Sequence, residues 1–364
     1  MKPLTYDILI SFSCSTIISL LLIPQIIRFS KKFNLVDKPD ERKVHIIPIA
    51  RLAGIAIFFA SLFGVLFSNY GRAAISDLPI YFSAVAGMFL LGIWDDLKNI
   101  SAKLRFLLQI GISLSIAFSG IRLTSLHGIL GIQELSIFWQ YLVSVLIIVG
   151  VTNAFNLIDG IDGLAGGLAL ISIVALAIVA YLLDFNSLLI VYIALAGALI
   201  GFLYYNFSPA KIFMGDGGSV MLGFFISSSG ILLIETSLLH PGKVEPSRVA
   251  LIVTALLIIP VFDTVRVFMG RMFKGISPFK ADKTHIHHLF LIAGLNHRKT
   301  CYFLYSFAFL LLIISFFAPI HTYISITIFL MVFLFNIITE ILRINQGVEK
   351  WLKIIHKMEK GEVL

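Results

Sequence analysis

Long apolar stretches recur along the whole chain, and they constrain its fold more than any other feature. A helix needs roughly 20 mostly apolar residues to cross a hydrocarbon core about 30 Å thick. Eleven stretches are predicted to be spanning helices, at 7–28, 48–68, 76–94, 104–121, 138–157, 164–183, 186–206, 217–238, 248–270, 301–319 and 322–343. With 59% hydrophobic and only 13% charged residues, no sizeable soluble domain fits beside them. We therefore predict an all-α, polytopic integral membrane protein with one transmembrane domain over residues 1–364.

Positive charge is distributed unevenly over the connections between these stretches. If the stretches alternate in direction, all but five of the 28 Lys and Arg residues fall on one side. Because cytoplasmic loops retain Lys and Arg, the amino terminus is predicted outside and the carboxyl terminus in the cytoplasm. Residues 344–364 then form a cytoplasmic tail whose amphipathic pattern is typical of a helix on a membrane surface. The net charge of +8 suits anionic lipid head groups and substrates, and we expect no nucleic acid as a partner.

Five aspartates stand at the ends of predicted spanning helices, all on the predicted cytoplasmic side. They are Asp95, Asp96, Asp159, Asp162 and Asp216. Ionisable groups at membrane depth are costly unless they are paired or hydrated, so we interpret these as functional. Carboxylate oxygens suit hard divalent ions, which in turn neutralise phosphate charge. The sequence therefore predicts a cleft that binds a diphosphate with Mg²⁺, or with Mn²⁺ in its place.

The segment 153–163 places polar side chains three residues apart. These are Asn153, Asn156, Asp159 and Asp162, which would share one face of a helix end. Gly160 and Gly163 allow a tight turn or the close approach of a ligand. A polar seam between helices would show the same pattern and remains an alternative. For Asp95 and Asp96 alone, the alternative is a solvated helix end.

Two further motifs are compatible with phosphate binding. A glycine-rich segment at 213–219 contains Asp216 and leads into a helix, whose free amides could meet phosphate oxygens, although Asp is also an ordinary helix cap. His285, His287 and His288 lie in a basic loop. A zinc site is the alternative for these imidazoles, but no cysteine is near them in the sequence. We favour hydrogen bonding to a phosphate or sugar.

Taken together, these motifs resemble the polyprenyl-phosphate N-acetylhexosamine-1-phosphate transferase superfamily, in the same order and over nearly the whole chain. Segments 260–266 and 277–288 are similar to the branch that begins O-antigen, enterobacterial common antigen or teichoic acid linkage synthesis. There are two departures. Residues 50–54 read Ala-Arg-Leu-Ala-Gly where the superfamily usually has Pro-Arg-x-Gly-Gly, so the resemblance does not determine the geometry of this loop. The third acid that often follows the aspartate pair is Asn99 or absent.

The resemblance implies transfer of N-acetylglucosamine-1-phosphate from UDP-GlcNAc to undecaprenyl phosphate, releasing UMP, at the cytoplasmic face of a bacterial inner membrane. It implies that Asp216 and Asp95 hold Mg²⁺, that Asp95 and Asp96 serve the lipid phosphate, and that Asp159 and Asp162 serve the nucleotide. The other substrate-binding residues that we expect are Asn156, Asn206, Phe213, Lys43, His45, Arg266, His285, His287 and His288. Direct attack by the lipid phosphate and a covalent two-step route are both compatible with these residues.

Three other functions would share some of these features. UDP-MurNAc-pentapeptide or another UDP-HexNAc could be the donor. An ion-coupled transporter would carry its ionisable groups near the midplane within an inverted repeat, and no repeat is visible. An alcohol phosphotransferase of the CDP-lipid type would need an arginine that the sequence after Asp162 lacks. Membrane lipids are expected partners, and the sequence leaves a homodimer open.

Overall fold

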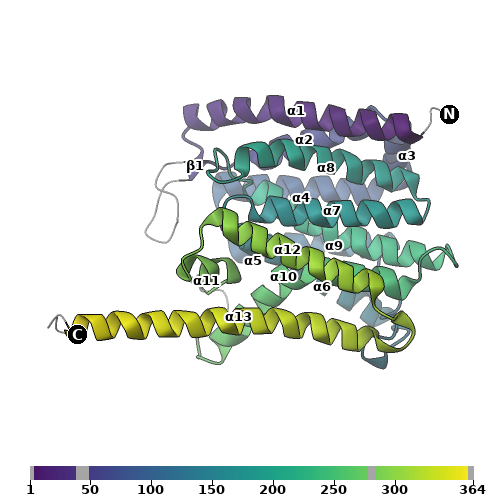
Figure 1. The fold of residues 1–364 in the computed structure, drawn as a ribbon. Coiled ribbons are helices and arrows are strands. Elements are labelled where there is room, and N and C mark those ends of the chain that lie inside the picture. The colour runs from purple at the N-terminus through teal and green to yellow at the C-terminus, as the bar shows by residue number, and fades with distance from the viewer. Residues whose placement is uncertain (1–3, 38–48, 278–283, 360–364) are drawn as a thin grey trace.

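The computed structural model describes residues 4–37, 49–277 and 284–359, which are mostly helical. The helices are α1 (Leu4–Lys32), α2 (Ala53–Leu66), α3 (Asn69–Asp77), α4 (Pro79–Lys98), α5 (Ala102–Phe118), α6 (Ile137–Ile158), α7 (Leu164–Leu182), α8 (Asn186–Asn206), α9 (Asp216–Leu238), α10 (Pro246–Met272), α11 (Ile286–Ile292), α12 (His297–Phe317) and α13 (Ile320–Glu359). A short 3₁₀ helix, η1 (Ile129–Gly131), and two paired strands, β1 (Val36–Asp37) and β2 (Ile49–Ala50), complete them. Figure 1 shows the long helices lying side by side along a common direction.

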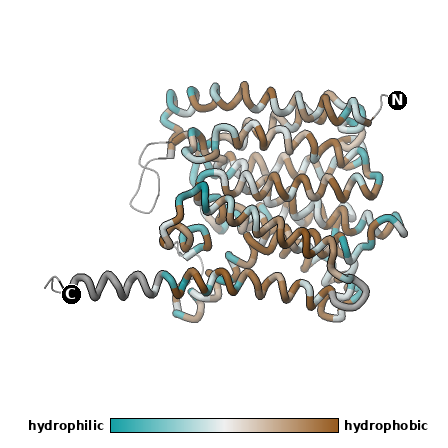
Figure 2. The backbone as a smooth tube through the Cα atoms, viewed as in Figure 1, coloured by the Kyte–Doolittle hydropathy of each residue, from teal (hydrophilic) through white to brown (hydrophobic). Residues whose placement is uncertain are grey.

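The predicted all-α membrane fold is confirmed, and each of the eleven predicted ranges contains a helix. Within the described part of the chain, nine helices are long and apolar enough to cross a membrane. Helices α2 and α3, bent by 106° at the break between them, could form a tenth span. Helix α5, in the predicted range 104–121, has 17 residues and is not among these candidate spans. Figure 2 shows the apolar residues along the helices and the hydrophilic ones mainly near their ends.

Helix α9 occupies the centre of the bundle. Every residue from Gly217 to Ile234 is buried, and the helix packs against α4, α6, α7 and α10. Close packing depends on small residues, since a Cβ on Gly223 would come within 2.8 Å of the Phe155 Cβ. Most serines of this helix donate to carbonyls of the preceding turn, as Ser228 does to Phe224 at 2.6 Å, whereas the hydroxyl of Ser229 pairs with that of Tyr81 on α4 at 2.7 Å. The first residue of α9, Asp216, is thereby held at the middle of one end of the bundle.

Helix α13 is longer than expected. It continues as one helix from Ile320 to Glu359, so residues 344–359 extend the last predicted span without a break, and the helix projects past the bundle in Figure 1. No proline interrupts this stretch, and Gly347 alone is too weak a signal to end a helix. The predicted tail is therefore helical up to Glu359.

Candidate active site

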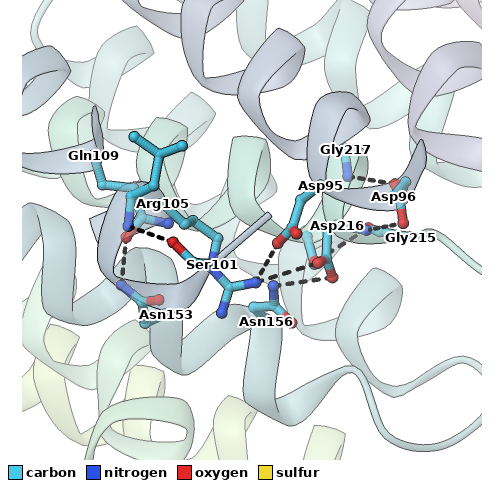
Figure 3. Close-up of polar contacts among 12 residues, drawn as sticks. Asp95, Asp96, Ser101, Arg105, Gln109, Asn153, Asn156, Gly215, Asp216 and Gly217 are labelled. Carbon is cyan, nitrogen blue, oxygen red and sulfur yellow. Dashed lines mark hydrogen bonds and ion pairs between the residues drawn. The ribbon is translucent and has the colours of Figure 1, made fainter. Parts of the chain in front are cut away.

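The aspartates predicted to act together meet where α4 ends and α9 begins. Asp95 lies in the last turn of α4 and Asp216 is the first residue of α9. One guanidinium nitrogen, Nη1 of Arg105, lies 2.5 Å from Oδ2 of Asp95 and 3.3 Å from Oδ2 of Asp216. The Nδ2 of Asn156 donates to the other oxygen of Asp216 at 3.1 Å. Figure 3 shows this group of carboxylates around the arginine.

Asp96 points away from this group and caps helix α9. Its Oδ1 accepts the backbone N–H of Asp216 at 3.1 Å, and its Oδ2 accepts that of Gly217 at 2.9 Å (Figure 3). The first amides of a helix have no partner within it, and a carboxylate there also interacts favourably with the helix dipole. A Cβ on Gly215 would come within 2.7 Å of Asp96 Oδ2, so glycine makes this approach possible. In this structure Asp96 is a positioning residue for Asp216.

The segment 50–54 packs against the loop before α9 despite its departure from the superfamily pattern. The backbone of Phe213 donates to the carbonyl of Ala50 at 2.7 Å, and Gly54 donates to the carbonyl of Met214 at 2.9 Å. A Cβ on Gly54 would lie 2.3 Å from the backbone nitrogen of Gly218, whereas the methyl group of Ala53 is accommodated and buried. One glycine is therefore enough for this packing.

Asp159 and Asp162 follow α6 and differ in environment. Burial, together with the nearby carboxylates of Asp216 and Asp96, raises the pKa of Asp159 to about 7. Burial also acts on Asp162, but hydrogen bonds from His297 and the Ala210 amide outweigh it and lower the pKa of that carboxyl. The Asp162 carboxylate is 3.2 Å from Nδ1 of His297. Asp159 therefore belongs with the central aspartates, and Asp162 anchors the start of α12.

The histidine motif lies against the turn after α6. Asp263 is buried and holds the motif in place, accepting from His285 Nδ1 at 2.8 Å and from Arg266 Nη2 at 2.6 Å. His287 is also buried and packs on Gly160, where an added Cβ would be 2.3 Å from its Nε2. Burial lowers the pKa of His287 to about 3, so its imidazole is neutral. The ring of His288 lies 4.3 Å from that of His287, centroid to centroid.

Three predicted substrate-binding residues make contacts within the protein. Asn206 is buried and accepts the Gly163 amide at 3.0 Å while its Nδ2 donates to the Ile212 carbonyl at 2.8 Å. Arg266 also donates from Nη2 to the Thr284 carbonyl at 2.7 Å. Phe213 is half-buried in the loop before α9. Two other predicted residues, Lys43 and His45, lie outside the described residues.

Two residues of the site were missed by the sequence reasoning. Arg105 lies at the start of the predicted spanning helix 104–121 and was not among the predicted site residues, although it supplies the central positive charge. Gln109, one turn further along α5, is fully buried, and its Oε1 accepts from Asn153 Nδ2 at 2.7 Å (Figure 3). The available signal was their spacing, because positions four apart share one helix face, and a buried glutamine within an apolar stretch needs a partner.

The carboxylates offer an incomplete metal site by themselves. Among the described residues, no group of three or more His, Cys, Asp or Glu side chains is arranged to hold a metal ion. Asp95 and Asp216 nevertheless face one cationic nitrogen from two sides. Mg²⁺ typically takes one or two protein carboxylates and fills its octahedron with water and substrate phosphates. Two carboxylates of this kind fit that requirement.

The fold and this site define a membrane-bound transferase class, and the chain belongs to glycosyl transferase family 4, whose model matches residues 78–234. It is 36% identical over 310 residues to a probable undecaprenyl-phosphate N-acetylglucosaminyl 1-phosphate transferase of Bacillus subtilis, covering 83% of this chain and 82% of that relative. It is 33% identical over 280 residues to an undecaprenyl-phosphate alpha-N-acetylglucosaminyl 1-phosphate transferase of Escherichia coli K12, covering 75% and 73%. The undecaprenyl-phosphate alpha-N-acetylglucosaminyl 1-phosphate transferase of Yersinia pestis is 35% identical to this chain over 277 residues, covering 74% of this chain and 72% of the relative.

Proposed function

We propose that this chain transfers N-acetylglucosamine-1-phosphate from UDP-GlcNAc to undecaprenyl phosphate. The observation that supports this most is the convergence of Asp95, Asp216, Asn156 and Arg105 at one end of the bundle, combined with the names of the relatives. An oxygen of the lipid phosphate attacks the β-phosphorus of the donor. The bond from that phosphorus to the oxygen bridging it to UMP breaks, and UMP leaves. One phosphoanhydride replaces another, so no energy source is needed.

The position of each residue in the site indicates its role. Asp95 and Asp216 would hold Mg²⁺, which when bound neutralises the charge of the diphosphate. Arg105 lies between the two carboxylates and can donate to phosphate oxygens. Asn156 fixes one oxygen of Asp216, and Asp96 fixes its backbone. Positioning and charge neutralisation of this kind account for most of the catalysis in phosphoryl transfer.

The site is proposed to lie at the cytoplasmic face of a bacterial inner membrane. Lys and Arg are concentrated in the connections at the aspartate end of the bundle, as the positive-inside rule requires of cytoplasmic loops. In a Cys14→Ser background, a cysteine at the exposed Ser76 should react with an impermeant maleimide in whole cells. A cysteine at the exposed Lys274 should react only after permeabilisation, and the opposite pattern would reverse the orientation.

The metal assignment is tested by Asp216→Asn. Purified protein in detergent, given undecaprenyl phosphate, UDP-GlcNAc and Mg²⁺, should release UMP, and the variant should lose most of this turnover. Asp184→Asn is the matched control, because this exposed aspartate pairs only with Lys243 among the described residues and surface pairs contribute little. Asp216→Asn with wild-type turnover would refute the role of Asp216.

The donor is tested by competition. A mixture of UDP-GlcNAc, UDP-GalNAc and UDP-MurNAc-pentapeptide is supplied with undecaprenyl phosphate, and the lipid products are identified by mass. We expect the GlcNAc product, with UMP released in equal amount. Comparable use of the pentapeptide donor would overturn the choice of sugar, and release of UDP would overturn the reaction itself.

A further inference from the structure

An apolar groove on the side of the bundle lies outside the aspartate site. Helices α7 and α12 and the end of α8 line this groove, whose volume is about 500 Å³. Its walls include Leu170, Val174 and Ile178 of α7, Phe309 and Ile313 of α12, and Phe207 after α8. Val174 and Ile178 are each 45% exposed, and Phe309 and Ile313 are each 55% exposed. The groove, which we call the α7–α12 groove, therefore opens sideways from the bundle.

The length of this groove matches one leaflet of a membrane. Its wall on α7 runs from Gly167 to Ile178, which at about 1.5 Å per residue is roughly 16 Å. Half of a hydrocarbon core about 30 Å thick is about 15 Å. Gly167 lies near the start of α7, at the end of the bundle that holds the aspartates. The groove thus spans the leaflet on the aspartate side.

Polar groups close the groove at the aspartate end. The hydroxyl of Tyr305 donates to the Gly163 carbonyl at 2.6 Å, and a Cβ on Gly167 would lie 2.0 Å from that hydroxyl. The ring of Phe207 lies 5.8 Å from that of Tyr302, which is itself 59% exposed. An amphipathic aromatic side chain at this position is typical of the boundary between the hydrocarbon and the head groups.

A positive charge lies next to this end of the groove. Arg298, Tyr302, Tyr305 and Phe309 follow each other at helical spacing along one face of α12. The Nε of the exposed Arg298 donates to the Ser208 carbonyl at 2.7 Å, next to Phe207. That bond fixes the guanidinium next to Phe207 at the aspartate end of the groove, and its Nη nitrogens, which have no partner among the described residues, can bind an anion. A second exposed cation, Lys211, follows three residues after Ser208.

We propose that the α7–α12 groove binds an anionic phospholipid, with one acyl chain between α7 and α12 and its phosphate at Arg298. The depth of one leaflet suits a phospholipid chain, whereas the much longer undecaprenyl chain would extend far beyond the groove. The positive charge of Arg298 at the aspartate end of the groove favours an anionic head group over a zwitterionic one. The site is separate from the proposed reaction and does not depend on it.

Lipid retention by purified protein tests this proposal. Native mass spectrometry after addition of phosphatidylglycerol or phosphatidylcholine with identical acyl chains measures the bound fraction of each. Wild-type protein should prefer phosphatidylglycerol. Arg298→Ala should weaken phosphatidylglycerol binding about fivefold, the effect of one Lys or Arg near a membrane surface, and leave phosphatidylcholine unchanged. Arg298→Lys should restore part of the preference.

Blocking the groove provides an independent variant. Val174→Trp should reduce retention of both lipids, while Leu21→Trp, at a position 62% exposed on α1, should not. Lys31→Ala, which removes an exposed cation at the end of α1, controls for diffuse attraction. Unchanged phosphatidylglycerol binding by Arg298→Ala, or an equal loss in Lys31→Ala, would refute the site. Displacement of phosphatidylglycerol by an equal concentration of undecaprenyl phosphate would show that the acceptor occupies the groove instead.

Discussion

The neighbouring residues Asp95 and Asp96 should respond differently to the same substitution. Both are 5% exposed, but Asp96 accepts two backbone amides of α9 while Asp95 pairs with Arg105. A hydrogen bond to a charged group contributes about 1.5–3 kcal/mol. Asn at position 96 offers one oxygen, so one amide loses its acceptor and faces an NH₂ group. We expect Asp96→Asn to lower the free energy of unfolding by about 2–3 kcal/mol.

Asp95→Asn should cost much less stability. Its amide oxygen can still accept from Arg105, and Arg105 keeps its contact with Asp216. Because Arg105 is 27% exposed, solvent weakens the lost charge interaction, which we place at about 0.5–1 kcal/mol.

The two variants are compared by unfolding in mixed detergent micelles titrated with SDS, and by UMP release. Both should lose turnover, because Asp95 is proposed to hold the metal and Asp96 holds the backbone of Asp216. Only Asp96→Asn should unfold markedly earlier. Equal stability of the two variants would refute the assignment of Asp96 as the cap of α9.

Two further predictions concern the turn after α6. Gly160→Ala should displace the His287 ring, lower the free energy of unfolding by about 1–3 kcal/mol and reduce turnover. Gly150→Ala is the control and should be neutral, because there is open space around its Cβ. If both variants behave like the wild type in the SDS titration and the UMP assay, the packing of His287 on Gly160 is contradicted. The pKa of Asp159 is raised to about 7 in the folded protein. Between about pH 4 and 7 the folded state therefore binds more protons than the unfolded state, and the free energy of unfolding falls as the pH rises through that window. Asp159→Asn should therefore raise the melting temperature in EDTA more at pH 8 than at pH 5, and a larger gain at pH 5 would disprove the raised pKa.

The arrangement of helices along the chain could be predicted from the sequence because the length of an apolar stretch is a local property. Each predicted range contains a helix, from α1 to α13. The positions of Asp95, Asp159 and Asp216 at helix ends were likewise readable, since a charge within the hydrocarbon is costly. The end of α13 was predicted less well, because no strong signal marks where a helix leaves the membrane.

The roles of individual side chains were decided only by the tertiary structure. Successive residues on a helix point about 100° apart, so packing of α4 against α9 determines that Asp95 faces Arg105 while Asp96 faces the amides of α9. Arg105 enters the site because α5 packs beside α4, and Asn206 is used internally because α8 ends against the loop before α9. Such contacts join segments distant in sequence, and no local pattern specifies the rotation of one helix against another.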